Sequence, residues 1–274
     1  MRLISNLLGM LAGLICFVSA GAAQAGDAWK LSDVLRIDDV IEVLRDEGLK
    51  FGADLDNDML AGRGGAFWAT QVGRVYDLAW MKDTVRIALS QGLSDTEIAQ
   101  ALDFFDTELG QKILSLETSA RRAMTNPEVE EIAHDAYLSL KGSDDARLAT
   151  ITRFIEVNDL LERNVAGSLN ASYAFMRGLV QGGGSEMSDE EITADIWAQE
   201  EETRVDTQEW LYGFMLLAYR PLSDAQLEAY IAFSETTAGQ ALNGALFDGF
   251  DNMYRGISHA LGVQVAEAAS YKEL

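Results

Sequence analysis

Cysteine, proline and histidine are scarce in this chain of 274 residues, and each scarcity restricts what it can be. The single cysteine, Cys16, lies within the first 25 residues, so the rest of the chain has no disulfide, thiolate metal ligand or cysteine nucleophile. The two histidines, His134 and His259, are not tied by any motif to a serine and a carboxylate, so no catalytic triad is predicted. Stability must come from a hydrophobic core, which 48% apolar residues can supply.

Positive charge is scarce too. Asp and Glu total 44 against 21 Lys and Arg, and the net charge is −23. A field this negative repels nucleic acid and anionic lipid headgroups, so we predict no nucleic-acid partner. Solubility explains the charge best, and a cationic partner or loosely held divalent cations are the alternatives. No cofactor-binding motif is found, and we predict no cofactor and no tightly bound metal.

The first 25 residues predict a secretory signal peptide. Arg2 supplies positive charge, residues 7–20 form an apolar run, and Ala23-Gln24-Ala25 fits a cleavage site. The apolar run is short and broken by Gly and Ser, which disfavours a permanent span, although an uncleaved anchor is an alternative. We therefore expect an exported protein, with a mature chain that begins at Gly26 and no stable membrane span.

Helix-start motifs and apolar spacing predict helices throughout. Complete capping boxes pair Ser94 with Glu97, Ser188 with Glu191 and Ser223 with Gln226. The two prolines fit helix boundaries: Pro127 follows the capping residue Asn126, and Pro221 should end a helix. Residues 34–44 and 148–165 each carry one continuous stripe of helical spacing, and no run alternates as a strand would. We therefore predict an all-α fold.

A segment in the first half of the chain recurs near its end. The sequence LSDTEIAQALDFFDTELGQ begins at Leu93, and LSDAQLEAYIAFSETTAGQ begins at Leu222, 129 positions later. The capping box and one Phe, Thr, Gly and Gln keep the same register, the phenylalanines being Phe104 and Phe233. Helical periodicity alone would not preserve these identities, so we predict an internal duplication.

Upstream of these segments, an offset of 120 aligns Asp39 with Asp159 and the glycine-rich loop 62–65 with 182–185. Each predicted unit then holds a long helix, a glycine loop, a second helix, a third helix at the repeated segment and a fourth helix. We predict units at 26–142 and 143–274, packed as two bundles with approximate two-fold pseudo-symmetry. Residues 210–219 are apolar all round, so we expect this helix to pack against the first unit, with an exposed docking surface as the alternative.

Residues 209–263 resemble the exported bacterial family called domain of unknown function 2059. The resemblance is carried by Leu222-Ser223-Asp224, Phe233, Thr236 and Gly239, followed by an amphipathic final helix. The first copy resembles the family less clearly through its equivalent residues, which would give two tandem copies. The prolines that family members often carry after Ser or Thr are replaced here by Glu108 and Thr237. The resemblance implies a helical, exported protein of a Gram-negative bacterium, so we expect a periplasmic location. It supplies no catalytic residues.

The motifs that could carry chemistry are incomplete. Glu131 and His134 have the spacing of one arm of a di-iron site, but a second such motif is missing. Residues 54–58 begin like a calcium loop but lack the later glycine and glutamate. The acidic run at residues 200–202 could bind a cationic peptide. We therefore predict a non-catalytic binding or assembly protein of the bacterial envelope, with an unknown protein partner or self-association.

Four aromatic residues form the predicted binding surface, because they lie in the repeated segment or in the apolar helix: Phe104, Phe233, Trp210 and Phe214.

Two alternative functions stay open. The first is a hydrolase in the cleft between the units, which needs two carboxyl groups with strongly raised pKa values. The second is a carrier with an apolar tunnel between the units that holds an apolar ligand.

Overall fold

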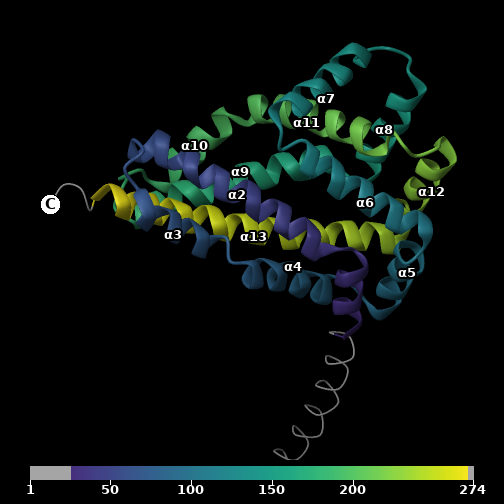
Figure 1. Cartoon of the computed structure of the whole chain (residues 1–274), viewed down its shortest axis with the longest axis horizontal. Helices are drawn as coiled ribbons and strands as arrows, with labels where there is room; N and C mark the ends of the chain where they lie inside the picture. The colour runs from purple at the N-terminus through teal and green to yellow at the C-terminus, as the bar shows by residue number, and fades with distance from the viewer. Residues whose placement is uncertain (1–25, 271–274) are drawn as a thin grey trace, which may run out of the picture.

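A computed structural model describes residues 26–270, and throughout that range the secondary structure is helix and turn without a strand (Figure 1). The predicted all-α fold is confirmed. Residues 1–25, which hold the predicted signal peptide, and residues 271–274 lie outside the described range. Among the helices of residues 26–270, none combines the length and the hydropathy needed to cross a bilayer.

The described chain begins with a helical stretch at residues 26–34, followed by the helices labelled in Figure 1. Their bounds are α2 (Ile37–Leu60), α3 (Gly65–Val75), α4 (Leu78–Gly92), α5 (Asp95–Phe105), α6 (Glu108–Ala123), α7 (Pro127–Leu140), α8 (Ala146–Val157), α9 (Leu160–Gln181), α10 (Asp189–Ala198), α11 (Glu200–Tyr219), α12 (Asp224–Ser234) and α13 (Thr237–Ser270). The predicted unit boundary at 142/143 falls in the turn between α7 and α8.

Local capping chemistry sets the helix starts as predicted. Complete capping boxes form at Ser94, Ser188 and Ser223, and the Asn126 side chain accepts a hydrogen bond from the Glu128 amide at the start of α7. These side chains satisfy amides that the first helical turn leaves without partners.

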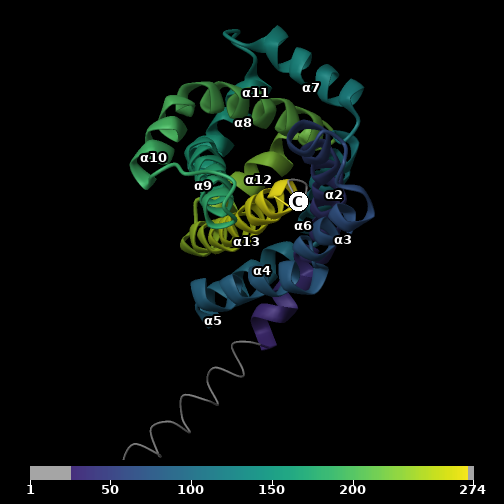
Figure 2. The ribbon, with the colours of Figure 1, turned by 90° about the vertical axis from the view of Figure 1, so that its left-hand side faces the viewer.

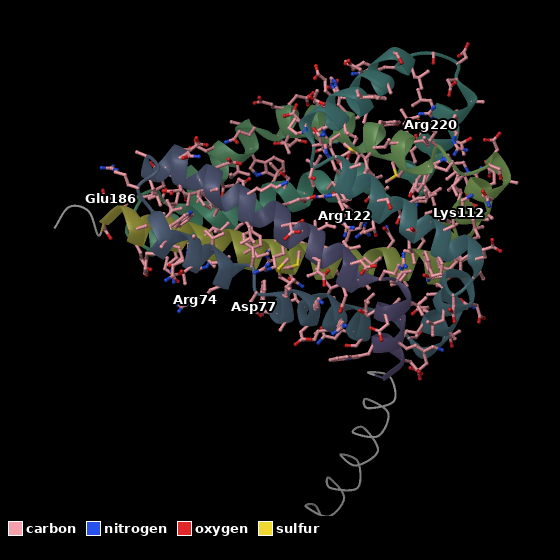
Figure 3. The ribbon with its side chains drawn as sticks, in the orientation of Figure 1. Arg74, Asp77, Lys112, Arg122, Glu186 and Arg220 are labelled. Atoms are coloured by element: carbon pink, nitrogen blue, oxygen red, sulfur yellow. The ribbon has the colours of Figure 1, made fainter. Side chains whose placement is uncertain are left out.

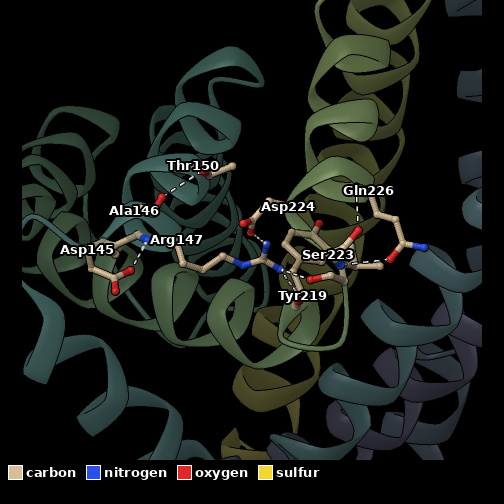
Figure 4. Close-up of polar contacts among 10 residues, drawn as sticks. Asp145, Ala146, Arg147, Thr150, Tyr219, Ser223, Asp224 and Gln226 are labelled. Atoms are coloured by element: carbon tan, nitrogen blue, oxygen red, sulfur yellow. Dashed lines mark hydrogen bonds and ion pairs between the residues drawn. The ribbon is translucent and has the colours of Figure 1, made fainter.

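Pro221 stops α11, and the turn that follows is closed by a hydrogen bond from the Leu222 amide to the Tyr219 carbonyl at 2.9 Å. The carbonyls at this helix end also accept hydrogen bonds from side chains. The guanidinium of Arg147, in α8, donates to the carbonyls of Tyr219 and Leu222 and pairs with Asp224 at 3.0 Å (Figure 4). Lys112 of α6 also reaches this corner, donating to the Pro221 carbonyl at 3.3 Å (Figure 3).

The predicted four-helix unit is wrong, because both long stripes are divided into two helices. Arg36 and Asp159 take left-handed backbone conformations, with φ of 57° and 52°, and α2 and α9 begin directly after them. The predicted offset of 120 is therefore wrong at the helix starts, where the offset is 123. The segment between each glycine loop and the repeated segment also folds as two helices, α3 and α4 in the first half and α10 and α11 in the second.

The repeated segment has the same local structure in both halves. Thr107 and Thr236 each cap the following helix by accepting from the amide of Gly110 or Gly239. A Cβ atom at either glycine would lie within 2.5 Å of the backbone oxygen of Phe104 or Phe233, so only glycine fits. The repeated motif therefore has a structural explanation.

The glutamine that follows each glycine joins three helices. Gln111 donates to the carbonyls of Phe105 and Val34, and Gln240 donates to those of Ser234 and Val157, at distances of 2.7–2.9 Å. Val34 and Val157 end the helices that precede the two left-handed residues. The side chains thus satisfy carbonyls that the breaks at 35–36 and 158–159 expose.

The hydrophobic cores draw on both halves of the chain. One cluster combines residues 26–34 and α2–α5 chiefly with α13, and the other combines α6–α8 with α11 and α12. In Figures 1 and 2, α13 runs between α9 and α4. The final helix of each half therefore packs into a core built mainly from the other half.

Helix α11 packs against α6 and α7 of the first half and against α8 and α9 of the second. This confirms that the apolar segment 210–219 packs against the first predicted unit. Copying of an ancestral unit and an overall two-fold axis stay predictions.

Candidate functional site

A cavity of about 390 Å³ lies between the two halves of the fold, and we call it the chamber. Its size falls within the range of about 300–1,000 Å³ that is usual for small-molecule sites. Apolar and aromatic side chains from both halves make most of its wall, among them Val40, Leu44, Leu114, Phe154, Phe214, Met215, Leu242, Leu246, Phe247 and Phe250.

Equivalent positions of the two halves line the same chamber. At the offset of 129, Leu114, Glu117, Thr118 and Arg121 of α6 correspond to Asn243, Leu246, Phe247 and Phe250 of α13, and all eight residues line the chamber. The rings of the equivalent residues Phe104 and Phe233 stack directly, with centroids 4.4 Å apart. A residue can touch its own counterpart only where the two halves meet, so the chamber lies at that meeting point.

Glu117 places a carboxyl group in this wall. Its Oε1 accepts a hydrogen bond from the Tyr219 hydroxyl at 2.6 Å and from the Tyr230 hydroxyl at 3.3 Å. Burial raises the pKa of Glu117 to about 7, although both tyrosine hydrogen bonds act in the opposite direction. Burial and the nearby carboxyl group also raise the pKa of both tyrosines, so their hydroxyls stay protonated donors.

The second carboxyl oxygen of Glu117, Oε2, receives no hydrogen bond from the described residues. Among residues 26–270, the hydrogen bonds to this carboxyl group all reach Oε1. Glu117 keeps partial solvent accessibility although it is enclosed by the fold, which is expected for a side chain that borders a cavity. Oε2 can therefore meet a group held in the chamber.

Three amide side chains that line the chamber are already engaged. Asn158 donates to the Phe154 carbonyl, Asn164 to the Leu160 carbonyl and Asn243 to the Asn158 carbonyl, at 2.7–2.9 Å. These bonds satisfy backbone groups at the break between α8 and α9. They leave the Glu117 carboxyl group as the acid that lines the chamber among the described residues.

Sequence reasoning missed Glu117, although a signal existed. Helix α6 buries Gly110, Ile113, Leu114 and Ala120, and Glu117 falls on the same face at helical spacing. Comparison of the two copies would have shown an acid where the second copy has Leu246. A charged residue at a core-facing position is costly unless it has partners, so an acid on this face of α6 indicates either buried partners or a cavity.

A wider cleft of about 920 Å³ adjoins the chamber, and we call it the outer cleft. Arg121, Asn164, Phe247, Phe250 and Tyr254 line both spaces. The wall of the outer cleft includes exposed side chains such as Phe51, whose exposed fraction is 50%. The chamber is therefore adjacent to a space that reaches the surface.

Arg121 stands at the junction of the two spaces. It pairs with Glu47 of α2 through two hydrogen bonds of 2.8 and 2.6 Å, and its guanidinium lies 5.1 Å from the centre of the Trp210 ring. Bidentate pairing and ring contact fix the orientation of a guanidinium group.

The four predicted binding residues lie near these spaces, all partly buried. Phe233 and Phe214 line the chamber, and Trp210 lines the outer cleft and stacks on Phe214 with ring centroids 5.2 Å apart. Phe104 lies behind Phe233 and also contacts Tyr230, with centroids 5.8 Å apart. The structure thus brings the four residues to one region inside the fold, where Phe233, Phe214 and Trp210 line the two spaces and Phe104 lines neither.

His134 lies away from the chamber, on the surface between α7 and α11. Its Nε2 is 3.0 Å from Glu209, which also pairs with Lys141 at 3.1 Å. The hydrogen bond to Glu209 raises the pKa of His134 and lowers that of Glu209. The side chains of Glu131 and His134 border the same shallow pocket, of about 490 Å³.

The other acidic motifs find structural partners. Residues 54–58 lie within α2, and Asp56 accepts a hydrogen bond from the Gly64 amide at 2.7 Å, which closes the turn after that helix. Glu200 of the acidic run pairs with Arg204 at 2.7 Å, and Arg204 also pairs with Glu162.

One family of proteins matches part of the chain. The family model described as "Uncharacterized protein conserved in bacteria (DUF2059)" matches residues 80–136. The predicted resemblance to this bacterial family is confirmed over these residues. No curated protein and no solved structure matches the chain.

The matched span covers most of α4, all of α5 and α6, and the first part of α7. It includes Glu117 and Arg121. The sequence favoured the second copy, at 209–263, as the clearer member, whereas the match falls on the first copy. A second tandem copy of the family stays a prediction.

Proposed function

We propose that this protein is an exported, non-catalytic binding protein of the bacterial envelope that holds a small, largely apolar molecule in the chamber. The observation that supports this most is the carboxyl group of Glu117 in a wall of aromatic and aliphatic side chains. Sites for small molecules commonly combine an apolar cavity with a few polar groups that orient the ligand.

The cost of burying Glu117 supports a role beyond packing. A leucine occupies the equivalent position in the second half, so the same wall can be built without a carboxyl group. A buried carboxyl group lowers stability unless it is well partnered, and one oxygen of Glu117 receives no hydrogen bond from residues 26–270. Oε2 is not among the buried side-chain atoms that lack a partner, so it is accessible at the chamber wall, where a ligand could hydrogen bond it.

The ionisation of Glu117 suits a ligand with a hydroxyl or amine group. With a pKa of about 7, both forms of the carboxyl group are populated near neutral pH. The ionised form accepts a hydrogen bond from O–H or N–H, and the neutral form can donate one. The ligand would therefore be an apolar molecule with one hydrogen-bonding group.

A small-ligand function is better supported than the two other functions that the sequence left open, a carboxylate hydrolase and a protein-docking protein. A carboxylate hydrolase needs two acids in the cleft between the halves, and the described lining of the chamber holds one. A protein-docking role for Phe104, Phe233, Trp210 and Phe214 is less well supported than a small-ligand role, because these rings pack on one another inside the fold. An interior cavity favours the carrier reading.

The test uses N-phenylnaphthylamine, a neutral apolar dye with one N–H group whose fluorescence rises in apolar surroundings. We expect binding to the native protein and its loss in Leu246→Trp, which fills the chamber. Leu138→Trp is the matched control, because Leu138 is 42% exposed on α7 and outside the chamber. Equal dye binding by both variants, or none by the native protein, would contradict the proposal.

A second chamber variant, Val40→Phe, also fills part of the chamber and should weaken dye binding, so it repeats the test if Leu246→Trp does not fold. Thermal unfolding followed by circular dichroism checks that each variant is folded. Glu117→Leu should weaken dye binding several-fold while leaving the chamber open, because one hydrogen bond contributes about 1 kcal/mol. Export is tested separately, by the mass of protein from the periplasmic fraction, which should begin at Gly26.

A further inference from the structure

We infer that the ligand is a cationic amphiphile. Its largely apolar part, including the hydrogen-bonding group that meets Glu117, lies in the chamber, and a separate ammonium group lies in the outer cleft. The inference rests on the proposed function, since it requires an occupied chamber. It goes beyond that function by assigning the charge of the ligand and its direction in the site.

The arrangement of the two spaces sets the direction. Apart from Asn164, which lines both spaces, the side chains of the chamber wall are buried or half-buried, whereas the wall of the outer cleft also includes the exposed side chains of Phe51, Asp54 and Asp206. Five residues line both spaces, so a chain longer than the chamber would extend past Phe247 and Tyr254 into the cleft. A charged group keeps more of its hydration in the outer space, which places the polar end of the ligand there.

The charges of the outer cleft select a cation. Six carboxyl groups and three basic groups line it. Arg121 is paired with Glu47 through hydrogen bonds, and Asp251 pairs with Arg255 outside the lining. Arg163 lies 3.8 Å from Asp159 without a hydrogen bond, so its charge is less fully offset. Among the described residues, the lining groups without an ion pair are the carboxylates of Asp54, Glu130, Asp206 and Asp248 and the amine of Lys50.

Aromatic faces beside these carboxylates strengthen the selection. Phe51, Trp210 and Phe247 line the outer cleft. Arg121 already lies over the Trp210 ring at 5.1 Å and Arg163 over the Phe247 ring at 5.4 Å, so among the described residues Phe51 is the ring of this group without such a cation. Aromatic rings attract alkylated ammonium groups through their quadrupole, most strongly where water is partly excluded. The combination of ring faces and unpaired carboxylates distinguishes the cleft from the acidic surface in general.

Arg121 does not reverse this preference. Its charge is offset by the bidentate pair with Glu47, and the Trp210 ring covers part of the guanidinium. A paired and oriented guanidinium can instead form the boundary between the apolar chain and the charged end.

The experiment compares three probes that share one alkyl chain: octyltrimethylammonium, octanol and octanoate. Calorimetric titration of the full mature chain at low salt should give the tightest binding for octyltrimethylammonium, about tenfold tighter than for octanol, with octanoate weakest. The preference over octanol should shrink as salt is raised, because exposed charges are screened.

The double variant Asp54→Asn and Asp206→Asn should lose most of the preference for the cation and leave octanol binding unchanged. Its matched control is Asp195→Asn with Glu201→Gln, which removes two exposed charges outside the cleft lining. Leu246→Trp should abolish binding of all three probes. An equal loss of cation binding in the control would assign the effect to net charge and overturn the inference.

The outcomes separate the two proposals. If octanol binds as tightly as the cation, the inference is wrong and the chamber remains a binding site. If octyltrimethylammonium binds equally well to Leu246→Trp, the chain does not enter the chamber and the inference is wrong. If neither the three probes nor the dye bind, the proposed function fails as well.

Discussion

Residues 108–140 and residues 237–270 occupy equivalent positions in the two halves, yet they fold differently. The first stretch is broken into α6 and α7, whereas the second is the single helix α13. At the offset of 129, Pro127 corresponds to Gly256, in the middle of α13. A proline removes a backbone donor and clashes with the preceding turn, so it stops a helix that the other half continues.

This difference decides where each helix packs. Helix α13 lies along α9 for most of its length and also contacts α4, whereas α7 turns away and packs on α11. The residues at the break, Met124 and Thr125, border the outer cleft. The break between α6 and α7, which has no counterpart in α13, thus lies at the wall of the outer cleft.

The chamber walls differ in the same way. The first half contributes Glu117 and Arg121, and the second contributes Leu246 and Phe250 at the equivalent positions. Equivalent positions of the two halves therefore carry different side chains in the chamber wall, and the charged groups of that wall come from the first half. Such a site can orient a ligand, which a symmetric site could not.

The largest expected effect concerns the seam between α9 and α13. A Cβ atom at Gly262 would lie 2.2 Å from the Phe175 carbonyl oxygen, so Gly262→Ala must push the helices apart. We expect a loss of about 3 kcal/mol in the free energy of unfolding, measured with urea.

Two other glycines calibrate this result. At Gly213, where α11 meets α7, the nearest atoms are 3.1 Å away, so Gly213→Ala should cost less. Gly244 of α13 has no neighbour within 4 Å of the added atom, so Gly244→Ala should stabilise the protein by about 0.5–1 kcal/mol. Equal losses at Gly262 and Gly244 would contradict the close packing of α13 on α9.

The next effect makes the two chamber walls alike. Glu117→Leu places in the first half the residue of the second, but it also removes the acceptor of the Tyr219 and Tyr230 hydroxyls, which costs stability at every pH. Relative to the native protein, the free energy of unfolding of the variant should nevertheless rise by about 2 kcal/mol between pH 5 and pH 8. The folded-state pKa of Glu117 is about 7, above its unfolded value, so the folded protein binds the extra proton between these values. Native stability should therefore fall as pH rises from about 4.5 through 7, and the variant should not show this decline.

Urea unfolding at several pH values measures that difference. Leu246→Glu is the reverse change and should be strongly destabilising. The two tyrosine hydroxyls are already held by Glu117, so they do not satisfy a second carboxyl group. A native stability that does not change between pH 5 and 8, relative to Glu117→Leu, would contradict the burial of this carboxyl group.

A smaller effect tests whether the repeated segment does the same structural work twice. Thr107→Ala and Thr236→Ala each remove a helix cap that accepts from a glycine amide, at 3.1 and 3.0 Å. We expect each to lose about 1 kcal/mol in the free energy of unfolding. A loss at one site and none at the other would show that the two copies contribute unequally.

The smallest effect concerns how α7 is held on α11. His134 hydrogen bonds Glu209, which raises the pKa of His134, and Glu209→Gln should lower that pKa toward its ordinary value. The stabilising contribution of this pair is present below the unfolded pKa of histidine and is lost as pH rises through the folded value. NMR titration of the His134 ring gives the pKa, and an unchanged pKa in the variant would contradict the contact.

Local signals predicted much of the fold. The capping boxes at Ser94, Ser188 and Ser223 start helices because their chemistry is complete within four residues. The breaks at Arg36 and Asp159 were missed, because the carbonyls they expose are satisfied by Gln111 and Gln240, which lie far along the chain. Periodicity cannot show such long-range partners.

The candidate site was predicted only in outline. The aromatic residues of the repeated segment and of α11 do converge, because both follow helical spacing within apolar segments. The packing of α13 with the first half could not be read from the sequence, and it is this arrangement that brings Glu117 opposite Leu246. Only the three-dimensional structure showed that an acid in an apolar stripe borders a cavity.

The most direct test of the central claim is native mass spectrometry of the protein purified from its own host without detergent. We predict an additional mass of one small organic molecule on the native protein, absent from Leu246→Trp and retained by Leu138→Trp. Protein that carries no bound molecule in any of the three forms, or an equal adduct on all three, would contradict the claim that the chamber holds a ligand.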